Sequence, residues 1–382
     1  MINKKAIVSV TNDLVTDQRV DRTCRTLVKM GYDVMQIGRK KRDSLPVPIR
    51  SYQTRRMVLL FEKGPLFYAE FNLRLFLLLL VKRADLLVSN DLDTLPANYF
   101  AQKWLRWFRN DKEPVLVHDC HEYYRGVPEL VGRKSVTSIW KWLEDITFPH
   151  LEKIYAVNGS IAGIYGREYG KTIEVIRNVP DRKGPSVAID RSELGIGPQQ
   201  KVILYQGAVN VDRGLEEAID AMEFIRQDVV FLILGTGDIF NELKERVKRK
   251  HLEKRVILAG AIPLESLHRY TLLGDIGLSI EKNVCINYYF ALPNKFMDYI
   301  QANIPVLVSP FPEMKAIVEQ YNIGSFIVSH DPRELAATIE GILGNREQLM
   351  DYRKNMPVAA AELCWENEEE KLKRIFSETT GT

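Results

Sequence analysis

The sequence is poor in cysteine and shows none of the cysteine spacings typical of metal sites or disulfide-bonded domains. Its four cysteines are scattered along 382 residues and never stand in a Cys-x-x-Cys pair: Cys24, Cys120, Cys285 and Cys364. We therefore expect a reducing compartment, no disulfide framework and no structural zinc. The chain also lacks Gly-x-Ser-x-Gly, His-Glu-x-x-His and P-loop motifs. It has no basic stretch interleaved with aromatic residues either, so no nucleic-acid partner is predicted.

Long apolar runs are absent as well. The most apolar segment, residues 75–81, lies between Arg74 and Lys82 and is far shorter than the ~20 residues of a membrane span. The run at residues 6–10 is short and strand-like, so we do not expect it to act as a signal peptide. We therefore expect a cytoplasmic protein. Residues 1–56 carry thirteen Lys and Arg against five Asp, which indicates either peripheral contact with the inner, anionic face of a membrane or a solvated surface.

Two series of alternating apolar strands and amphipathic helices fill the chain, which predicts an α/β fold with two Rossmann-like domains facing across a cleft. Residues 181–200 are rich in charge, glycine and proline and indicate a linker. The predicted domains are residues 1–185 and 186–357, followed by a final helix within 358–382. No nucleophile with a paired base is evident, which fits a reaction whose electrophile is already activated.

The second half carries a candidate site for a nucleotide diphosphate. Pro293 is suited to a helix start, where free N–H groups favour an anion, and Lys295 adds a cation. Asp298, one turn on, can accept from paired hydroxyls. An ordinary helix of an α/β domain explains these residues equally well. Arg213 can pair with phosphate as a planar fork, and four glycines end strands where a backbone can approach a ligand: Gly207, Gly235, Gly237 and Gly260.

The first half places polar side chains after two strands. His118, His121 and Glu122 follow one strand, and we predict that His121 contacts a sugar hydroxyl or a leaving phosphate, with a structural histidine as the alternative. Two histidines without a third ligand argue against zinc. Asp91 and Asp93 follow another strand and resemble a metal-binding Asp-x-Asp, although a helix cap explains Asp93 more simply.

Together these segments resemble the retaining, nucleotide-sugar-dependent group-4-like family of GT-B glycosyltransferases over nearly the whole chain. The most specific segment is 292–300 with 305–309, and looser matches lie at 17–20, 90–95, 118–122, 178–180, 206–214 and 234–237. The resemblance implies an enzyme of the hexosyltransferase type that moves a sugar from a UDP- or GDP-sugar to a glycan or lipid-linked acceptor. The nucleotide sugar is a substrate, and neither cofactor nor metal is expected.

The resemblance also implies roles for individual residues. Arg213 and Lys295 would stabilise the leaving diphosphate beside the helix start at Leu292 and Asn294, and Asp298 would bind ribose. The backbone at Ala261 and Ile262 would meet the base, and the first domain would hold the acceptor beside His121. The final helix would cross back onto the first domain.

Two positions depart from the family pattern. Phe290 stands where a sugar-binding glutamate is common, and Ala208 replaces a basic residue. Two further hypotheses therefore stay open, namely a nucleotide-sugar 2-epimerase of the same architecture and a catalytically degenerate binding protein.

Overall fold

The computed structural model describes residues 4–380 except 16, 109–112, 128, 129 and 131. The chain divides into two compact units, which we describe separately. The N-terminal unit comprises residues 1–178 and 367–382, and the C-terminal unit comprises residues 179–366. The first division, after residue 178, falls before the predicted boundary at 185. The second division, after residue 366, falls beyond the predicted boundary at 357.

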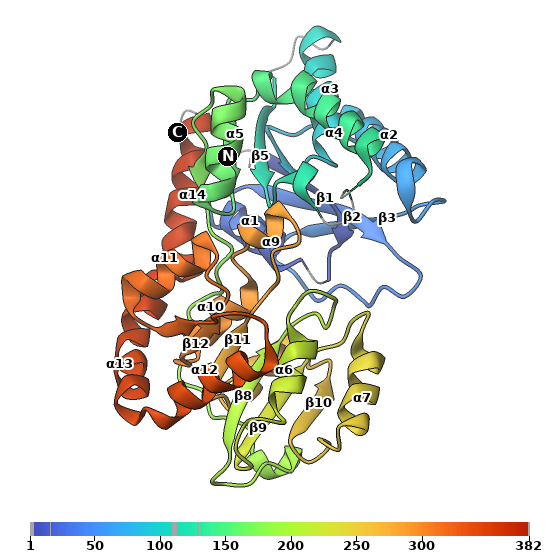
Figure 1. The fold of residues 1–382 in the computed structure, drawn as a ribbon. Helices are drawn as coiled ribbons and strands as arrows, with labels where there is room; N and C mark the ends of the chain where they lie inside the picture. Colours follow the sequence, from blue (N-terminus) through green and yellow to red (C-terminus); the bar gives the residue numbers. More distant parts are fainter. Residues whose placement is uncertain (1–3, 16, 109–112, 128–129, 131, 381–382) are drawn as a thin grey trace. The chain divides into compact units, whose positions relative to one another are not determined.

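The N-terminal unit is built on a seven-stranded parallel sheet with the order β3-β2-β1-β4-β5-β6-β7 (Figure 1). Its strands and helices run in the order β1 (Lys5–Asp13), α1 (Gln18–Lys29), β2 (Asp33–Lys40), β3 (Gln53–Val58), α2 (Gly64–Val81), β4 (Leu86–Asn90), α3 (Leu95–Phe108), β5 (Val115–Cys120), α4 (Lys134–Thr147), β6 (Lys153–Ala156), α5 (Gly159–Tyr169) and β7 (Glu174–Val175). Strand β3 was not predicted, because its sequence Gln-Thr-Arg-Arg-Met-Val is mostly polar, as an exposed edge strand allows.

The C-terminal unit has a six-stranded parallel sheet with the order β10-β9-β8-β11-β12-β13. Its elements are β8 (Lys201–Gln206), α6 (Leu215–Ala221), β9 (Val229–Leu234), α7 (Phe240–Arg249), β10 (Val256–Gly260), α8 (Leu264–Thr271), β11 (Ile276–Ser279), α9 (Ile286–Tyr289), α10 (Asn294–Gln301), β12 (Val306–Val308), α11 (Pro312–Tyr321), β13 (Gly324–Phe326), α12 (Pro332–Gly344) and α13 (Arg346–Glu362).

Both sheets have the Rossmann strand order. In this order the first three strands are added toward one edge of the sheet, and the later strands are added from the first strand toward the other edge. The reversal lies between β1 and β4 in the N-terminal unit, and between β8 and β11 in the C-terminal unit. Ligands of such sheets bind at the carboxyl ends of the strands at this switch point, because the flanking loops diverge there and leave a crevice. The topology therefore marks one candidate position in each unit.

The last helix, α14 (Trp365–Thr380), returns to the N-terminal unit, as we predicted. Glu369 on this helix accepts hydrogen bonds from Thr26 (3.0 Å) and Lys29 (2.8 Å) of α1. The linker prediction for residues 181–200 was wrong, because this segment belongs to the C-terminal unit. Ile189 and Ile196 are buried in its core, where they help to fix the segment in place.

Candidate functional site

Glu281, which follows β11 at the switch point of the C-terminal unit, lies between two cations. Lys295 Nζ is 2.6 Å from Glu281 Oε1, and Arg213 Nη1 is 3.6 Å from the same oxygen. The Glu281 side chain is fully buried, and Ser279 donates to its other oxygen at 3.0 Å. Burial favours the neutral acid, but Lys295 and Arg213 outweigh that effect and lower the pKa of Glu281. This triad carries a net positive charge at one sheet edge.

Local packing holds both cations in place. Gly214 has a φ of +74°, and a Cβ there would lie 2.5 Å from the Ile280 carbonyl oxygen, so glycine is required to bring the Arg213 loop against the Glu281 segment. The Arg213 guanidinium lies over the Tyr288 ring, 4.4 Å from its centroid. The ammonium of Lys295 lies 4.2 Å from the centroid of the Tyr205 ring.

Helix α10 begins directly beside the triad. Pro293 is its N-cap residue, Asn294 is its exposed first residue and Lys295 is buried. We expected Pro293 in the first turn of this helix, and the structure places it one position before that turn. The first turn contains the N–H groups of Asn294 and Lys295. The segment before it is anchored by Leu292, which is buried in the core of the unit.

The predicted ribose ligand, Asp298, is fixed by a buried polar chain. Gln206 at the end of β8 donates from Nε2 to Asp298 Oδ2 at 2.8 Å. Thr271 in turn donates to Gln206 Oε1 at 2.7 Å, which fixes the orientation of the amide. The switch-point strand β8 therefore sets the position of this carboxylate.

The predicted glycines lie together where β8, β9 and β10 end. A Cβ on Gly235, whose φ is +140°, would lie only 1.9 Å from the carbonyl oxygen of Gly207, and one on Gly237 would lie 2.3 Å from Asn210 Oδ1. Close packing between loops thus explains Gly235 and Gly237 without a ligand. Ala261, which is exposed, and Ile262, which is half-buried, follow β10 at the same edge of the sheet.

In the N-terminal unit, His121 lies between two carboxylates at the ends of β4 and β5. Its Nε2 is 3.0 Å from Asp119 Oδ2, and its Nδ1 is 3.2 Å from Asp91 Oδ2. Burial disfavours a charged imidazole, but the two carboxylates outweigh burial and raise the pKa of His121 to about 9. The geometry therefore holds His121 as an imidazolium at neutral pH.

Arg19 completes this cluster and was not foreseen. It forms a two-pronged ion pair with the fully buried Asp119, with Nη2 2.7 Å from Oδ1 and Nε 2.9 Å from Oδ2. Burial opposes ionisation of Asp119, yet the charges of Arg19 and His121 lower its pKa. Burial raises the pKa of Asp91 to about 6, and Asp91 also has a positive φ of 59°.

The remaining predicted residues of the N-terminal unit have mostly structural surroundings. His118 is 1% exposed, its Nδ1 faces the Ser89 carbonyl oxygen at 3.2 Å, and burial lowers its pKa to about 4. Asp93 is buried and accepts from Thr11 Oγ1 at 2.5 Å, and burial together with the Asp91 charge raises its pKa to about 7. Glu122 is half-buried in the loop after β5. The described part of the chain contains no group of three or more His, Cys, Asp or Glu side chains arranged for a metal.

Residues 186–358 match the family model described as glycosyl transferases group 1. An amylovoran biosynthesis glycosyltransferase of Erwinia amylovora is 25% identical over 170 residues, which cover 41% of this chain and 42% of that protein. The chain spans about two fifths of the length of the curated relatives it matches.

Solved structures resemble the chain over nearly its whole length. The sucrose-phosphate synthase of Thermosynechococcus elongatus has a TM-score of 0.77 at 18% identity, over 98% of this chain and 99% of that chain. Anabaena HepE in complex with UDP-glucose has a TM-score of 0.74 at 14% identity, over 98% and 99% of the two chains. At these identities the likeness establishes the fold.

Proposed function

We propose that this chain, a GT-B glycosyltransferase with a group 1 domain over residues 186–358, transfers hexosyl groups. The donor is a UDP- or GDP-sugar, and the acceptor is a glycan or a lipid-linked saccharide. The observation that carries the proposal is the convergence of Arg213 and Lys295 on Glu281 at the switch point, beside the start of α10. Two cations and a helix start suit a diphosphate, because each stabilises an anion.

In this proposal each part of the C-terminal site contacts one part of the donor. Arg213, Lys295 and the first N–H groups of α10 bind the two phosphates. Asp298, held by Gln206, accepts from the ribose hydroxyls, and the backbone at Ala261 and Ile262 contacts the base.

The reaction needs charge stabilisation more than an acid. The bond from the sugar's anomeric carbon to the phosphate oxygen breaks, and its electron pair leaves with the diphosphate. The acceptor hydroxyl oxygen bonds to that carbon and loses its proton. Arg213 and Lys295 stabilise the leaving charge, as a divalent cation does in other enzymes. With retention, attack comes from the face that the phosphate leaves, and a phosphate oxygen takes the proton.

The N-terminal unit supplies the acceptor side. His121 is held as an imidazolium whose two N–H groups face Asp91 and Asp119, and in this proposal its positive charge lies beside a sugar hydroxyl of the acceptor. His118 is not included in the proposal, because it is buried and already faces the Ser89 carbonyl. Asp91, Asp93 and Glu122 would then shape the surroundings of His121, with Asp93 held away from solvent by Thr11.

The experiment is incubation with a panel of UDP- and GDP-sugars, followed by detection of free nucleotide diphosphate and of the released sugar. Slow hydrolysis of one donor, lost in Arg213→Ala and Lys295→Ala, supports transfer. The anomeric configuration of the released sugar tests whether the reaction proceeds with retention. Addition of candidate acceptors tests the acceptor class. Release of the free 2-epimer identifies an epimerase and contradicts the proposal, and nucleotide binding without turnover of any donor identifies a degenerate protein.

A further inference from the structure

Three neighbouring helices of the N-terminal unit expose an unusual amount of apolar surface. Among the residues that the structure describes, ten of the twenty-five exposed large apolar residues lie on α2, α3 and α4. They are Leu66, Leu73, Leu77, Val81, Phe100, Trp104, Trp107, Phe108, Ile139 and Trp142. Water-exposed apolar side chains are common singly, but a gathering of this kind marks a contact surface.

Helix α2 is apolar on two sides. Phe67, Phe71, Leu75 and Leu79 are buried in the core of the unit, at i, i+4 spacing. Leu73, Leu77 and Val81 form a second stripe that is exposed, with Val81 at 76%. A helix that packs on one face normally carries polar residues on the other, so the core does not explain the second stripe.

Among the described residues, α2 is also the one helix long and apolar enough to cross a membrane. Phe71 and Leu75 are nevertheless fully buried against the sheet of the N-terminal unit, which favours a helix that lies on a membrane surface over one that crosses it.

The three helices lie side by side and form one region of the unit (Figure 1). Phe76 of α2 contacts Trp104 of α3 edge to face, with centroids 6.3 Å apart. Tyr68 of α2 contacts Trp140 of α4 in the same way at 5.1 Å. The region presents three exposed tryptophans, of which Trp107 is 81% exposed. Tryptophan is enriched at the boundary between lipid and water.

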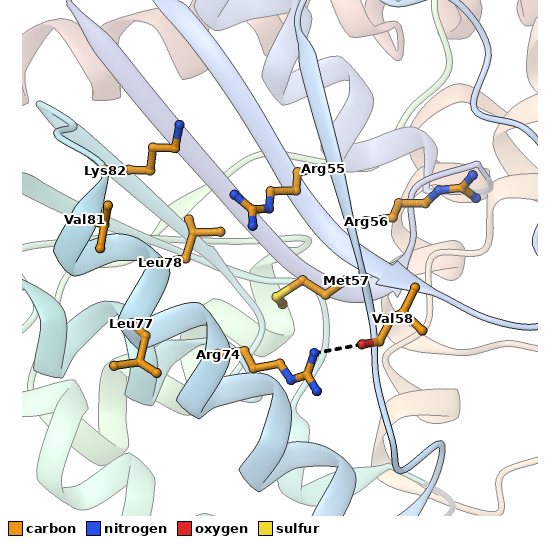
Figure 2. A pocket seen from close by; sticks show the side chains of 9 residues that line it. All are labelled: Arg55, Arg56, Met57, Val58, Arg74, Leu77, Leu78, Val81 and Lys82. Atoms are coloured by element: carbon orange, nitrogen blue, oxygen red, sulfur yellow. Dashed lines mark hydrogen bonds between the residues drawn. The ribbon is translucent and has the colours of Figure 1, made fainter.

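A cationic hollow of about 570 Å³ adjoins this region between β3 and α2 (Figure 2). Four basic residues line it together with apolar side chains, namely Arg55, Arg56, Arg74 and Lys82, and no acidic residue lines it. Arg74 donates to the Val58 carbonyl oxygen at 2.9 Å, whereas Arg55 and Lys82 are exposed. The acids of the three helices are already paired: Glu70 with Arg74, Asp145 with Lys141, and Glu144 with Arg125.

We infer that this face, formed by the exposed side chains of α2, α3 and α4 with Arg55 and Lys82, docks on an anionic phospholipid bilayer. Aliphatic and tryptophan side chains enter the interfacial layer, while the cations of the hollow contact lipid phosphates. Charge complementarity favours a lipid surface, because apolar and cationic groups are interleaved. The inference is independent of the proposed activity.

Of the thirteen basic residues of the segment 1–56 that the sequence indicated, this face uses Arg55. Many basic side chains of that segment are engaged within the N-terminal unit and are not available to a membrane. Arg19 binds Asp119, Arg22 binds Asn178, Arg25 and Arg50 bind Asp21, Lys29 binds Glu369, and Arg56 binds Asp13. Figure 2 shows Arg56 turned to the other side of β3 from Arg55, as alternation along a strand requires.

The test is cosedimentation of the full chain with vesicles of phosphatidylcholine alone and of phosphatidylcholine mixed with phosphatidylglycerol. We expect binding to the mixed vesicles that weakens with added salt. Leu73→Glu/Leu77→Glu should reduce partition by about tenfold or more, and Arg55→Glu/Lys82→Glu should remove the preference for anionic lipid. The matched control is Met350→Glu/Val358→Glu, two exposed apolar positions on α13 of the other unit, which should bind as the wild type does.

Each altered side chain is exposed, so unchanged thermal unfolding should accompany each variant. Absence of binding to both vesicle types overturns the inference, as does equal binding by wild type and Leu73→Glu/Leu77→Glu. Light scattering supplies a third outcome. In that outcome the wild type self-associates, the Leu73→Glu/Leu77→Glu variant is monomeric, and neither protein binds vesicles. The face would then join copies of the chain, and the lipid assignment would be wrong.

Discussion

Lys295 Nζ lies 2.6 Å from Glu281 Oε1, and these side chains are 7% and 0% exposed. Glu281 thereby fixes a buried lysine at the start of α10, where its charge adds to that of the helix N-terminus. A buried pair of this kind costs desolvation, so stability alone is a weak explanation for it. A diphosphate that needs a prepositioned cation explains the arrangement better.

The first prediction concerns this pair. Lys295→Met should lower the free energy of unfolding by roughly 3 kcal/mol, because it leaves the buried Glu281 carboxylate with Arg213 as its remaining cation. Lys295→Met/Glu281→Gln should recover much of that stability, since the fully buried carboxylate is replaced by a neutral amide and the Arg213 side chain, which is 22% exposed, keeps some contact with solvent. Both variants should lose donor turnover. Denaturant unfolding and donor hydrolysis measure the two effects, and a stable double variant with wild-type turnover would refute the role of Lys295.

Arg213 gives a second prediction. Arg213→Ala should weaken binding of a nucleotide diphosphate about tenfold to a hundredfold, the range expected for hydrogen bonds to a charged group. The matched control is Arg246→Ala, because Arg246 is similarly half-buried and pairs with Asp220 at 2.5 Å, on α7 and α6. That control should lose some stability and keep nucleotide affinity. Equal losses of affinity in both variants would indicate a general effect on folding.

Gly235 tests whether close packing builds the sheet edge. Gly235→Ala should destabilise the chain by roughly 3 kcal/mol or more, because the new methyl group meets the Gly207 carbonyl oxygen at 1.9 Å and the φ of +140° suits only glycine. Gly341→Ala, on an exposed face of α12 with nothing within 4 Å, should be neutral or stabilising by about 0.5–1 kcal/mol. Thermal unfolding distinguishes the two, and equal shifts would contradict the packing account.

The charge of His121 predicts a pH dependence. Its pKa is raised in the folded state to about 9, so the charged form contributes stability that is fully present below the unfolded value near 6.5 and is lost as pH rises through about 9. The difference in unfolding free energy between wild type and His121→Gln should therefore shrink over this window. A titration of the His121 ring near pH 6.5, followed by NMR, would contradict the prediction.

Much of the fold could be predicted because apolar periodicity reports burial directly. The strands of both sheets and helices such as α1 and α2 follow this pattern, and the return of the last helix was expected from the family resemblance. Strand β3 was missed because an edge strand needs few apolar residues. Residues 181–200 were misassigned because glycine, proline and charge are also common in irregular segments that pack on a core.

The site was only partly predictable. Arg213, Lys295 and Asp298 could be named because strand ends and helix starts are visible in sequence. Glu281 was missed, although it lies two residues after an apolar strand, because a buried charge pair depends on contacts between distant segments. The same holds for Arg19, whose partner Asp119 is 100 residues away. The predicted cleft between the two domains stays a prediction.

Titration calorimetry with UDP and GDP tests the central claim most directly, since the claim is that Arg213, Lys295 and the start of α10 form a diphosphate site. The account predicts that the wild type binds one of the two nucleotides, that Lys295→Met/Glu281→Gln and Arg213→Ala bind it at least about tenfold more weakly, and that Arg246→Ala binds it unchanged. Absence of binding by the folded wild type, or equal binding by all four proteins, would contradict it.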